Sequence, residues 1–156
     1  MGRRMLERLN RLVDEVGNLN SKLVLLVGPP RSGKTRLLNA LAKRRQAGMV
    51  NVGAAFGRLL LALPGPRRHA EASGLFKDLA AANANDGLVL LDNIELLFDR
   101  SLQLNPLDLL KRQAHVRRVV AAWPGEFSGG RLTYATTGHS EYQDYGIEGL
   151  VPFRTD

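Results

Sequence analysis

The chain has 156 residues, the usual size of one domain, and its 44% apolar and 24% charged residues are typical of a globular protein. It contains no cysteine, which excludes a disulfide scaffold, a thiol nucleophile, a zinc ribbon and an iron–sulfur cluster. The three histidines are too scattered for a histidine-built metal site. No apolar run approaches the ~20 residues of a membrane span, and the charged N-terminal sequence does not resemble a secretory signal. We therefore expect a cytoplasmic protein without a membrane segment.

The net charge of +7 is concentrated at the N-terminal end. Residues 1–48 hold 11 Lys and Arg against 3 Asp and Glu, whereas residues 49–156 hold 11 against 12. The excess lies in Arg3, Arg4, Arg8 and Arg11 and in the segment from Lys34 to Arg45. Because a positive pole attracts polyanions, DNA contact through this basic N-terminal pole is one hypothesis. A solvated helix face is an equally good interpretation of the same charges.

The first third of the chain alternates between helical and strand patterns. Residues 3–16 have apolar residues at helical spacing, and Gly17–Ser21 is a turn. Leu23–Val27 is a short apolar run, typical of a strand buried on both faces. A loop over Gly28–Gly33 then leads into a predicted helix over Lys34–Gln46.

The middle of the chain repeats this alternation. Met49–Val52 is a second predicted strand, followed by a helix over Ala54–Leu63. Pro64–Arg68 interrupts the pattern, and we expect a mobile surface loop there. Leu75–Ala84 is alanine-rich and predicted helical, and Leu88–Leu91 is a third strand, apolar throughout.

The last third is less regular. Ile94–Phe98 and Pro106–His115 are predicted helical pieces, and Val119–Trp123 is a fourth strand. After a glycine-rich turn, Leu132–Ala135 is a candidate fifth strand. We interpret His139-Ser140-Glu141 as a polar loop, because adjacent side chains do not form a catalytic triad. Strands that alternate with helices predict a three-layer α/β/α fold with a mostly parallel sheet.

The strongest motif is Gly28-Pro29-Pro30-Arg31-Ser32-Gly33-Lys34-Thr35, which matches the phosphate-loop pattern G-x-x-x-x-G-K-[ST] between a strand and a helix. The backbone N–H groups of such a loop and of the following helix bind phosphate oxygens. Lys34 places a positive charge near the β- and γ-phosphates, and Thr35 offers a hydroxyl to Mg²⁺. The predicted ligand is therefore ATP or GTP with Mg²⁺. The predicted nucleotide-binding residues are Gly28, Pro29, Pro30, Arg31, Ser32, Gly33, Lys34, Thr35 and Arg36.

A carboxylate follows the third strand and completes the predicted metal site. Asp92 comes directly after four apolar residues, so we predict that it is the Walker B acid that binds Mg²⁺ through its water shell, together with Thr35. Many hydrolytic P-loop ATPases have Glu next, which orients or deprotonates the attacking water. Here Asn93 stands in that position, and Glu95 lies two residues further on. Glu95 takes this role if the backbone is still extended there, so the predicted catalytic residues are Lys34, Asp92 and Glu95.

Six stretches of the chain together resemble one protein family. They are VGPPRSGKTRLLNAL, NVG near residue 51, LVLLDNIELLFD, NPLDLL, VVAAWPG and GRLTYATTGHSEY. In these stretches the chain resembles BrxF, the small P-loop nucleotide-binding proteins of type 3 BREX phage-defence systems, and the similarity runs from about Leu6 to Tyr145. The resemblance rests on LLDNIELLFD and on AWPG with GRLTY, because the P-loop itself is shared by many unrelated proteins.

The resemblance implies ATP or GTP binding at Gly28–Thr35, a metal-side acid at Asp92, and service in a bacterial complex that restricts phage beside a methyltransferase and larger ATPases. The implied partners are other BREX proteins or further copies of this chain. The fold resembles an AAA-type core without a helical lid, so that a neighbour would close the nucleotide site. The expected organisation is an N-terminal amphipathic helix and turn packed on the core over residues 1–21, the P-loop NTPase domain over residues 22–144, and a weakly patterned tail over residues 145–156 that is either loosely held or dependent on a partner.

Other functions fit parts of the same sequence. Asn93 and the missing lid favour a scaffold that binds nucleotide without hydrolysing it. A small-molecule P-loop kinase would need an arginine-rich lid, for which Pro64–His69 is the available segment. Arg117 and Arg118 precede the fourth strand, where an arginine acting on a neighbouring subunit can lie.

Overall fold

The computed structural model describes residues 2–135 and 142–156. The predicted polar loop His139-Ser140-Glu141 lies outside the described residues. Within the described part of the chain, no helix combines the length and the apolar character that crossing a bilayer requires.

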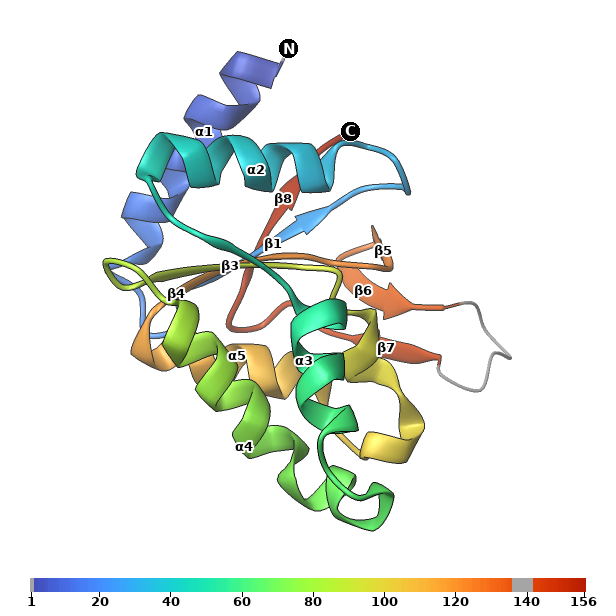
Figure 1. Cartoon of the computed structure of the whole chain (residues 1–156). Helices are drawn as coiled ribbons and strands as arrows, with labels where there is room; N and C mark the ends of the chain where they lie inside the picture. Colours follow the sequence, from blue (N-terminus) through green and yellow to red (C-terminus); the bar gives the residue numbers. More distant parts are fainter. Residues whose placement is uncertain (1, 136–141) are drawn as a thin grey trace.

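A five-stranded parallel sheet forms the middle layer, in the order β2-β3-β4-β1-β8 (Figure 1). Its strands are β1 (Leu23–Val27), β2 (Met49–Asn51), β3 (Leu88–Asp92), β4 (Arg118–Ala122) and β8 (Val151–Arg154). Two helices cover one face of the sheet, namely α1 (Gly2–Val16) and α2 (Lys34–Arg45). The opposite face is covered by α3 (Val52–Leu61), α4 (Gly65–Asn83) and α5 (Pro106–Val116). The predicted three-layer α/β/α fold is confirmed.

The apolar runs explain why the central strands are buried on both faces. All five residues of β1 are fully buried, and so are the first four residues of β3. Side chains alternate between the faces of a strand, so β1 contributes to both core clusters. Leu23, Leu25 and Val27 pack toward α3 and α5, whereas Val24 and Leu26 pack toward α1 and α2.

The segment Pro64–Arg68 is the start of a helix rather than the predicted mobile loop. Helix α4 begins at Gly65, ten residues before the predicted helix, and Pro66 lies in its first turn. A proline is tolerated there because the N–H groups of a first helical turn have no intrahelical partner. An ion pair of 2.7 Å between Arg67 and Glu71, one turn apart, further stabilises this end of the helix.

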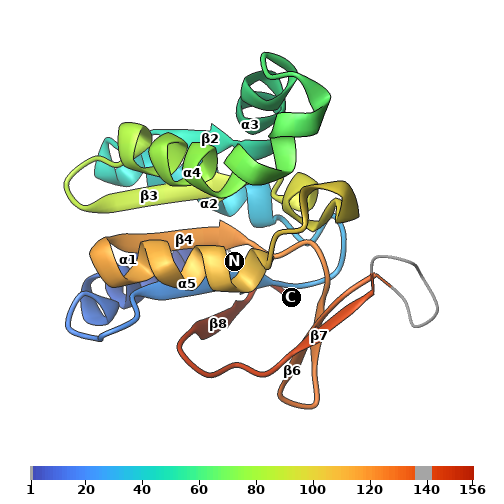
Figure 2. The ribbon, with the colours of Figure 1, turned by 90° about the horizontal axis from the view of Figure 1, so that it is seen from below.

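The candidate fifth strand belongs to a second, smaller sheet (Figure 2). Strand β6 (Arg131–Tyr134) pairs antiparallel with β5 (Glu126–Ser128) and β7 (Gln143–Tyr145). Gly129 and Gly130 both have positive φ and form the two-residue turn between β5 and β6. This backbone shape favours a tight hairpin, which sends the chain straight back instead of across to the parallel sheet.

The C-terminal segment was predicted to be a loosely held tail, and the structure corrects this. Strand β8 lies at the edge of the main sheet and pairs with β1 along its length. Phe153 is buried among residues of α1 and α2. A strand of four residues carries too little periodicity to be found in the sequence, because its stability comes from a partner far away in the chain.

Candidate functional site

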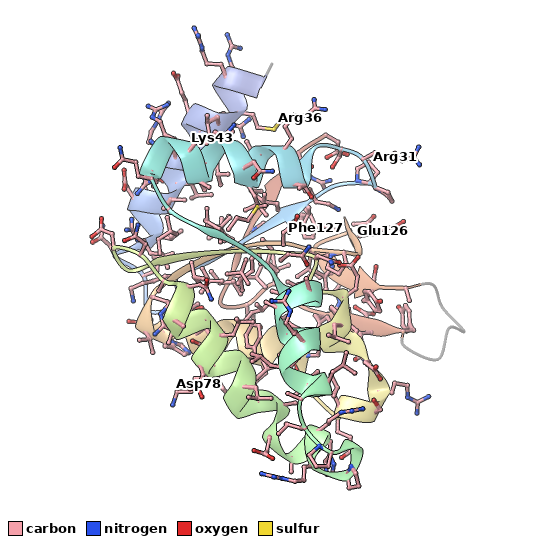
Figure 3. All side chains as sticks on the ribbon, in the orientation of Figure 1. Arg31, Arg36, Lys43, Asp78, Glu126 and Phe127 are labelled. Carbon is pink, nitrogen blue, oxygen red and sulfur yellow. The ribbon has the colours of Figure 1, made fainter. Side chains whose placement is uncertain are left out.

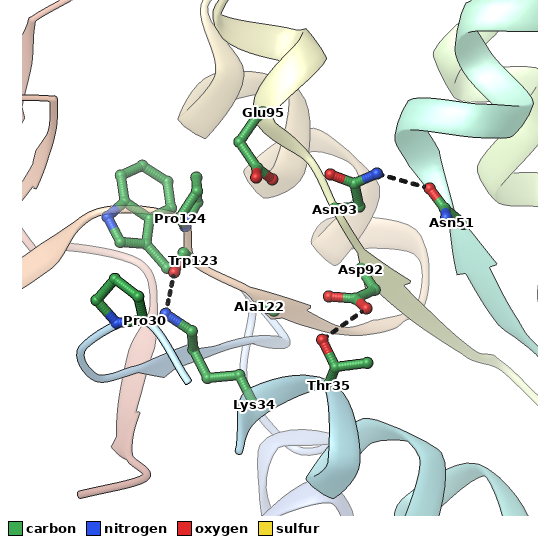
Figure 4. A pocket seen from close by; sticks show the side chains of 10 residues that line it. All are labelled: Pro30, Lys34, Thr35, Asn51, Asp92, Asn93, Glu95, Ala122, Trp123 and Pro124. Atoms are coloured by element: carbon green, nitrogen blue, oxygen red, sulfur yellow. Dashed lines mark hydrogen bonds between the residues drawn. The ribbon is translucent and has the colours of Figure 1, made fainter. Parts of the chain in front are cut away.

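The carboxyl ends of β1, β3 and β4 meet around a cavity of about 480 Å³. Figure 4 shows the side chains that line it. They are Pro30, Lys34, Thr35, Asn51, Asp92, Asn93, Glu95, Ala122, Trp123 and Pro124. Ligands of open α/β sheets bind in the crevice outside the carboxyl ends of the strands. The structure therefore brings the predicted residues Lys34, Thr35, Asp92 and Glu95 into one site of the expected kind.

The predicted phosphate loop turns tightly between β1 and α2. The Ser32 N–H donates to the Pro29 carbonyl at 3.1 Å, and both Arg31 and Gly33 have positive φ. Gly33 stands directly before the first turn of α2, and its carbonyl accepts from the Leu37 N–H at 2.9 Å. The free N–H groups of that first turn and the positive end of the helix dipole make this a favourable place for a phosphate.

Lys34 connects the loop to the end of β4. Its Nζ donates to the carbonyl oxygens of Gly28 at 2.8 Å and of Trp123 at 3.0 Å. Burial lowers the pKa of Lys34 below its usual 10.5, and the nearby carboxylates of Glu95 and Asp92 act in the opposite direction. The ammonium group is thus held over the cavity by two carbonyls and faces two carboxylates.

Thr35 and Asp92 form the second fixed pair of the site. The Thr35 Oγ1 donates to an Asp92 carboxylate oxygen at 2.9 Å (Figure 4). Mg²⁺ binds six oxygens at about 2.0–2.1 Å, which puts neighbouring ligands about 2.9 Å apart. The two oxygens therefore fit a magnesium ion that Thr35 ligates and that Asp92 binds directly or through its water shell. Among the residues in the structure no group of three or more His, Cys, Asp or Glu could hold a metal.

Asn93 turns the chain sharply after Asp92. Its φ of 54° is in the left-handed region, and the short 3₁₀ helix η1 (Glu95–Phe98) follows almost at once. The prediction that Glu95 reaches the site assumed that the backbone is still extended there. That condition is not met, yet Glu95 lines the cavity (Figure 4), because the turn at Asn93 redirects the chain toward it.

The stretch Asn51-Val52-Gly53 holds this turn from the next strand. The Asn93 Nδ2 donates to Asn51 Oδ1 at 2.9 Å, and the Gly53 N–H donates to the Asn93 carbonyl at 2.9 Å. A Cβ on Gly53 would lie 2.5 Å from Asn93 Nδ2, so the close approach requires glycine. Asn51 also caps α3, since its Oδ1 accepts from the Ala54 N–H at 3.1 Å. Asn93 is therefore bound to the β2–α3 turn, and Glu95 is the next carboxylate after Asp92 that lines the cavity.

A residue that the sequence analysis missed holds the phosphate loop from the C-terminal end. The Thr155 Oγ1 lies 3.1 Å from the Val27 carbonyl and 2.6 Å from Ser32 Oγ. A carbonyl only accepts, so the single Thr155 hydroxyl proton goes to Val27, and Ser32 donates to Thr155. A Cβ on Gly28 would lie 2.4 Å from Thr155 Oγ1 and 2.6 Å from Ser32 Oγ, so this arrangement requires the first glycine of the motif. No local pattern around Thr155 signals this contact.

The remaining predicted arginines differ in position. Arg31 and Arg36 are exposed and border a second hollow beside Thr35, at the mouth of the phosphate loop. Arg117 and Arg118 lie at the amino end of β4, away from the cavity. The Arg118 guanidinium donates to the Asp86 carbonyl at 3.0 Å, and Arg117 donates to the Gln113 side chain, so both are engaged within the chain.

Comparisons with known proteins support the fold. No family model and no curated protein matches the chain. Among solved structures 34 chains match, including PCH-2 of C. elegans, an AAA+ ATPase, with a TM-score of 0.51 and 16% sequence identity. The match covers 99% of this chain and 42% of PCH-2, so the chain spans about two fifths of the length of that neighbour. The chain has a P-loop NTPase fold.

Proposed function

We propose that the chain binds ATP or GTP with Mg²⁺ at Gly28–Thr35 and acts as an ATPase or nucleotide switch. The observation that carries this proposal is the placement of the Lys34 ammonium and the Thr35–Asp92 pair around one cavity at the carboxyl ends of the strands. Backbone N–H groups at the start of α2 would bind phosphate oxygens, and Lys34 would neutralise the terminal phosphates. Mg²⁺ held at Thr35 and Asp92 would stabilise the charge that develops on the phosphates.

Hydrolysis depends on Glu95 in this proposal. Its carboxylate faces the cavity and is exposed, so a water molecule can reach it. A carboxylate in that place can accept a proton from water or orient the water toward the terminal phosphate. The alternative is a scaffold that binds nucleotide without turnover. The observation in its favour is that the residue directly after Asp92 is Asn93, whose side chain donates to Asn51 and carries no carboxylate that could activate water.

We further propose that the chain works in the cytoplasm as a subunit of a BREX-type anti-phage complex. The resemblance of LLDNIELLFD, AWPG and GRLTY to the BrxF family supports this role. The open site supports a need for a partner, since Thr35 and Glu95 are both exposed. Exclusion of water strengthens electrostatic contacts in an active site, so another BREX protein or a second copy would complete it.

A small-molecule kinase is the weakest of the proposals. The segment Pro64–His69, the available lid, is part of the α3–α4 connection and the start of α4. Its arginines are engaged there, because Arg67 pairs with Glu71 and Arg68 donates to the carbonyls of Leu60 and Leu63.

The test is phosphate release with Mg²⁺-ATP and Mg²⁺-GTP, beside nucleotide binding. Trp123 is the single tryptophan of the chain and its carbonyl accepts from Lys34, so intrinsic fluorescence follows binding at the site. We expect Lys34→Ala to abolish binding and turnover. Glu95→Gln should keep the Kd within about threefold and lower turnover by about 10²-fold or more. Binding without phosphate release in the wild type would favour the scaffold, and no binding of either nucleotide would refute the proposal.

A further inference from the structure

Eight exposed cations gather on and beside the helices that cover one face of the sheet. Four lie on α1, three on α2 and one in the phosphate loop. They are Arg3, Arg4, Arg8, Arg11, Arg36, Lys43, Arg44 and Arg31. Figure 3 shows three of them, with Arg36 and Lys43 on the outer side of α2 and Arg31 at the end of the loop. We call these eight residues the basic face.

Helical spacing directs most of these side chains outward. Arg4, Arg8 and Arg11 are separated by four and three residues and so form one stripe on α1. The buried stripe of the same helix is Leu9, Val13 and Val16, five residues further along, which is about 140° around the helix axis. On α2, Arg36 and Lys43 are seven residues apart and lie opposite Leu38 and Leu41, which are buried. Because α1 and α2 pack in the same core cluster, the two stripes lie on adjacent helices of one layer.

The charges of the basic face are not neutralised within the chain. Among residues 2–135 and 142–156, none of the eight takes part in an ion pair, whereas Arg67, Arg112 and Arg131 elsewhere pair with carboxylates at 2.7–2.9 Å. Asp14 is held by Arg45 at 2.8 Å and by Arg118 at 3.5 Å, so it compensates other arginines.

We propose that the basic face binds the backbone phosphates of a nucleic-acid duplex, beside the nucleotide site. Its charges match a ligand that carries a negative charge every ~1.7 Å of its axis. Residues 1–48 contain no aromatic residue, and the Phe153 ring under Arg8 is buried, so these residues offer no exposed ring on which single-stranded bases stack.

Two other partners fit the face less well. An acidic protein would need an apolar centre, and the exposed large apolar side chains of the described residues include only Leu19 from this part of the chain. A membrane surface would need an exposed apolar side on α1, which is instead buried in the core. Arg31 and Arg36 also border the mouth of the phosphate loop, so the duplex and the nucleotide would share a rim.

The test compares two triple variants that lose the same charge. Arg4→Gln/Arg11→Gln/Lys43→Gln removes three of the eight cations of the basic face and spares every residue of the nucleotide site. Arg58→Gln/Lys77→Gln/Arg100→Gln removes three exposed cations on the side of α3, α4 and the 3₁₀ helix η2 (Arg100–Leu102). Binding to a labelled 20-base-pair duplex is measured by fluorescence anisotropy between 50 and 200 mM NaCl. Circular dichroism and nucleotide affinity report whether each variant is folded, independently of duplex binding.

The salt dependence decides the outcome. Each neutralised phosphate contact contributes about 0.9 to the slope of log K against log[salt]. We expect the basic-face variant to lower the wild-type slope by about 2 to 3 and to bind DNA of all sequences more weakly, whereas the control variant keeps the wild-type slope. An RNA duplex of the same sequence tells which nucleic acid binds more tightly. The proposal is wrong if the wild type binds neither duplex at 50 mM NaCl, or if the basic-face variant and the control variant lose the same amount of duplex affinity. It is also wrong if the wild type binds vesicles of anionic lipid, tested beside the duplexes, but no duplex.

Discussion

Thr155 gives the sharpest test of how the phosphate loop is held in shape. Thr155→Val keeps the side-chain volume but removes the hydroxyl that contacts Val27 at 3.1 Å and Ser32 at 2.6 Å. Each hydrogen bond contributes a net ~0.5–1.5 kcal/mol, so the free energy of unfolding should fall by about 1–3 kcal/mol. For a chain of this length about 2 kcal/mol corresponds to a melting temperature lower by roughly 4–8 °C.

The effect on the site separates this reasoning from a general loss of stability. The hydroxyl connects the end of β1 to Ser32 in the loop. Its loss lets the loop move, so that the backbone N–H groups that would bind phosphate are no longer held in position. We expect the ATP Kd, followed by the fluorescence of Trp123, to rise about tenfold in Thr155→Val, which is about 1.4 kcal/mol. Thr155→Ser keeps the hydroxyl and should change the Kd by less than about threefold.

A double-mutant cycle with Ser32→Ala then tests whether the two hydroxyls act through one hydrogen bond. If they do, the double variant binds ATP little worse than Thr155→Val alone. The reasoning is refuted if the two effects simply add, or if Thr155→Val and Thr155→Ser weaken ATP binding equally. An unaltered wild type that fails to bind ATP would instead refute the proposed function.

Three further predictions concern single positions. Gly28→Ala should weaken ATP binding and lower the melting temperature, because its methyl would lie 2.4 Å from Thr155 Oγ1; Gly74→Ala, where nothing lies within 4 Å, should not. Burial lowers the pKa of Lys34, so ATP affinity should fall with rising pH before pH 10.5 is reached; Lys34→Arg, charged throughout, should bind equally at both ends of such a titration. Burial raises the pKa of Tyr145 to about 12, so the folded state holds the phenol proton more tightly than the unfolded state. The stability that this group contributes is present below pH 10 and is lost as the pH rises through 12. In a spectrophotometric titration, the wild type should show a phenolate that forms near pH 12, and Tyr145→Phe should lack it.

The parts of the fold that local pattern determines could be predicted from the sequence. Apolar runs placed β1, β3 and β4 to within one residue of their ends, because a strand buried on both faces has no other composition available. The start of α4 was missed because Pro64, Gly65 and Pro66 are typical of a turn, yet a helix tolerates them in its first turn. β8 was missed because its burial depends on β1, about 130 residues earlier in the chain.

The same division holds in the site. The loop motif predicted where Lys34 and Thr35 lie, because its glycines and the start of α2 fix their positions locally. The orientation of Glu95 could not be predicted from the sequence. It depends on a left-handed backbone at Asn93, which Asn51 and Gly53 hold through hydrogen bonds from the end of another strand. Thr155 could not be foreseen for a similar reason: its contacts join residues 123 and 128 positions apart.

The three stretches on which the family resemblance rests contact one another next to Lys34. Trp123, from AWPG, is fully buried, and its indole Nε1 donates to the Thr133 carbonyl, from GRLTY, at 3.0 Å. Phe98, from LLDNIELLFD, packs edge-on against Trp123 with 5.4 Å between the ring centroids, and it stacks on Tyr134 with 3.8 Å between the ring centroids. The Trp123 carbonyl of this cluster accepts from Lys34, and the 3₁₀ helix that ends at Phe98 begins at Glu95.

This cluster joins the site to the small antiparallel sheet. A triphosphate that draws the Lys34 ammonium toward its oxygens competes with the Trp123 carbonyl for the same donor. Trp123, whose carbonyl would lose this donor, also donates from its indole to the Thr133 carbonyl of β6 and packs against Tyr145 of β7. In the proposed function, nucleotide binding would therefore act on contacts of η1, which carries Glu95, and of β6, two elements that lie outside the five-stranded sheet.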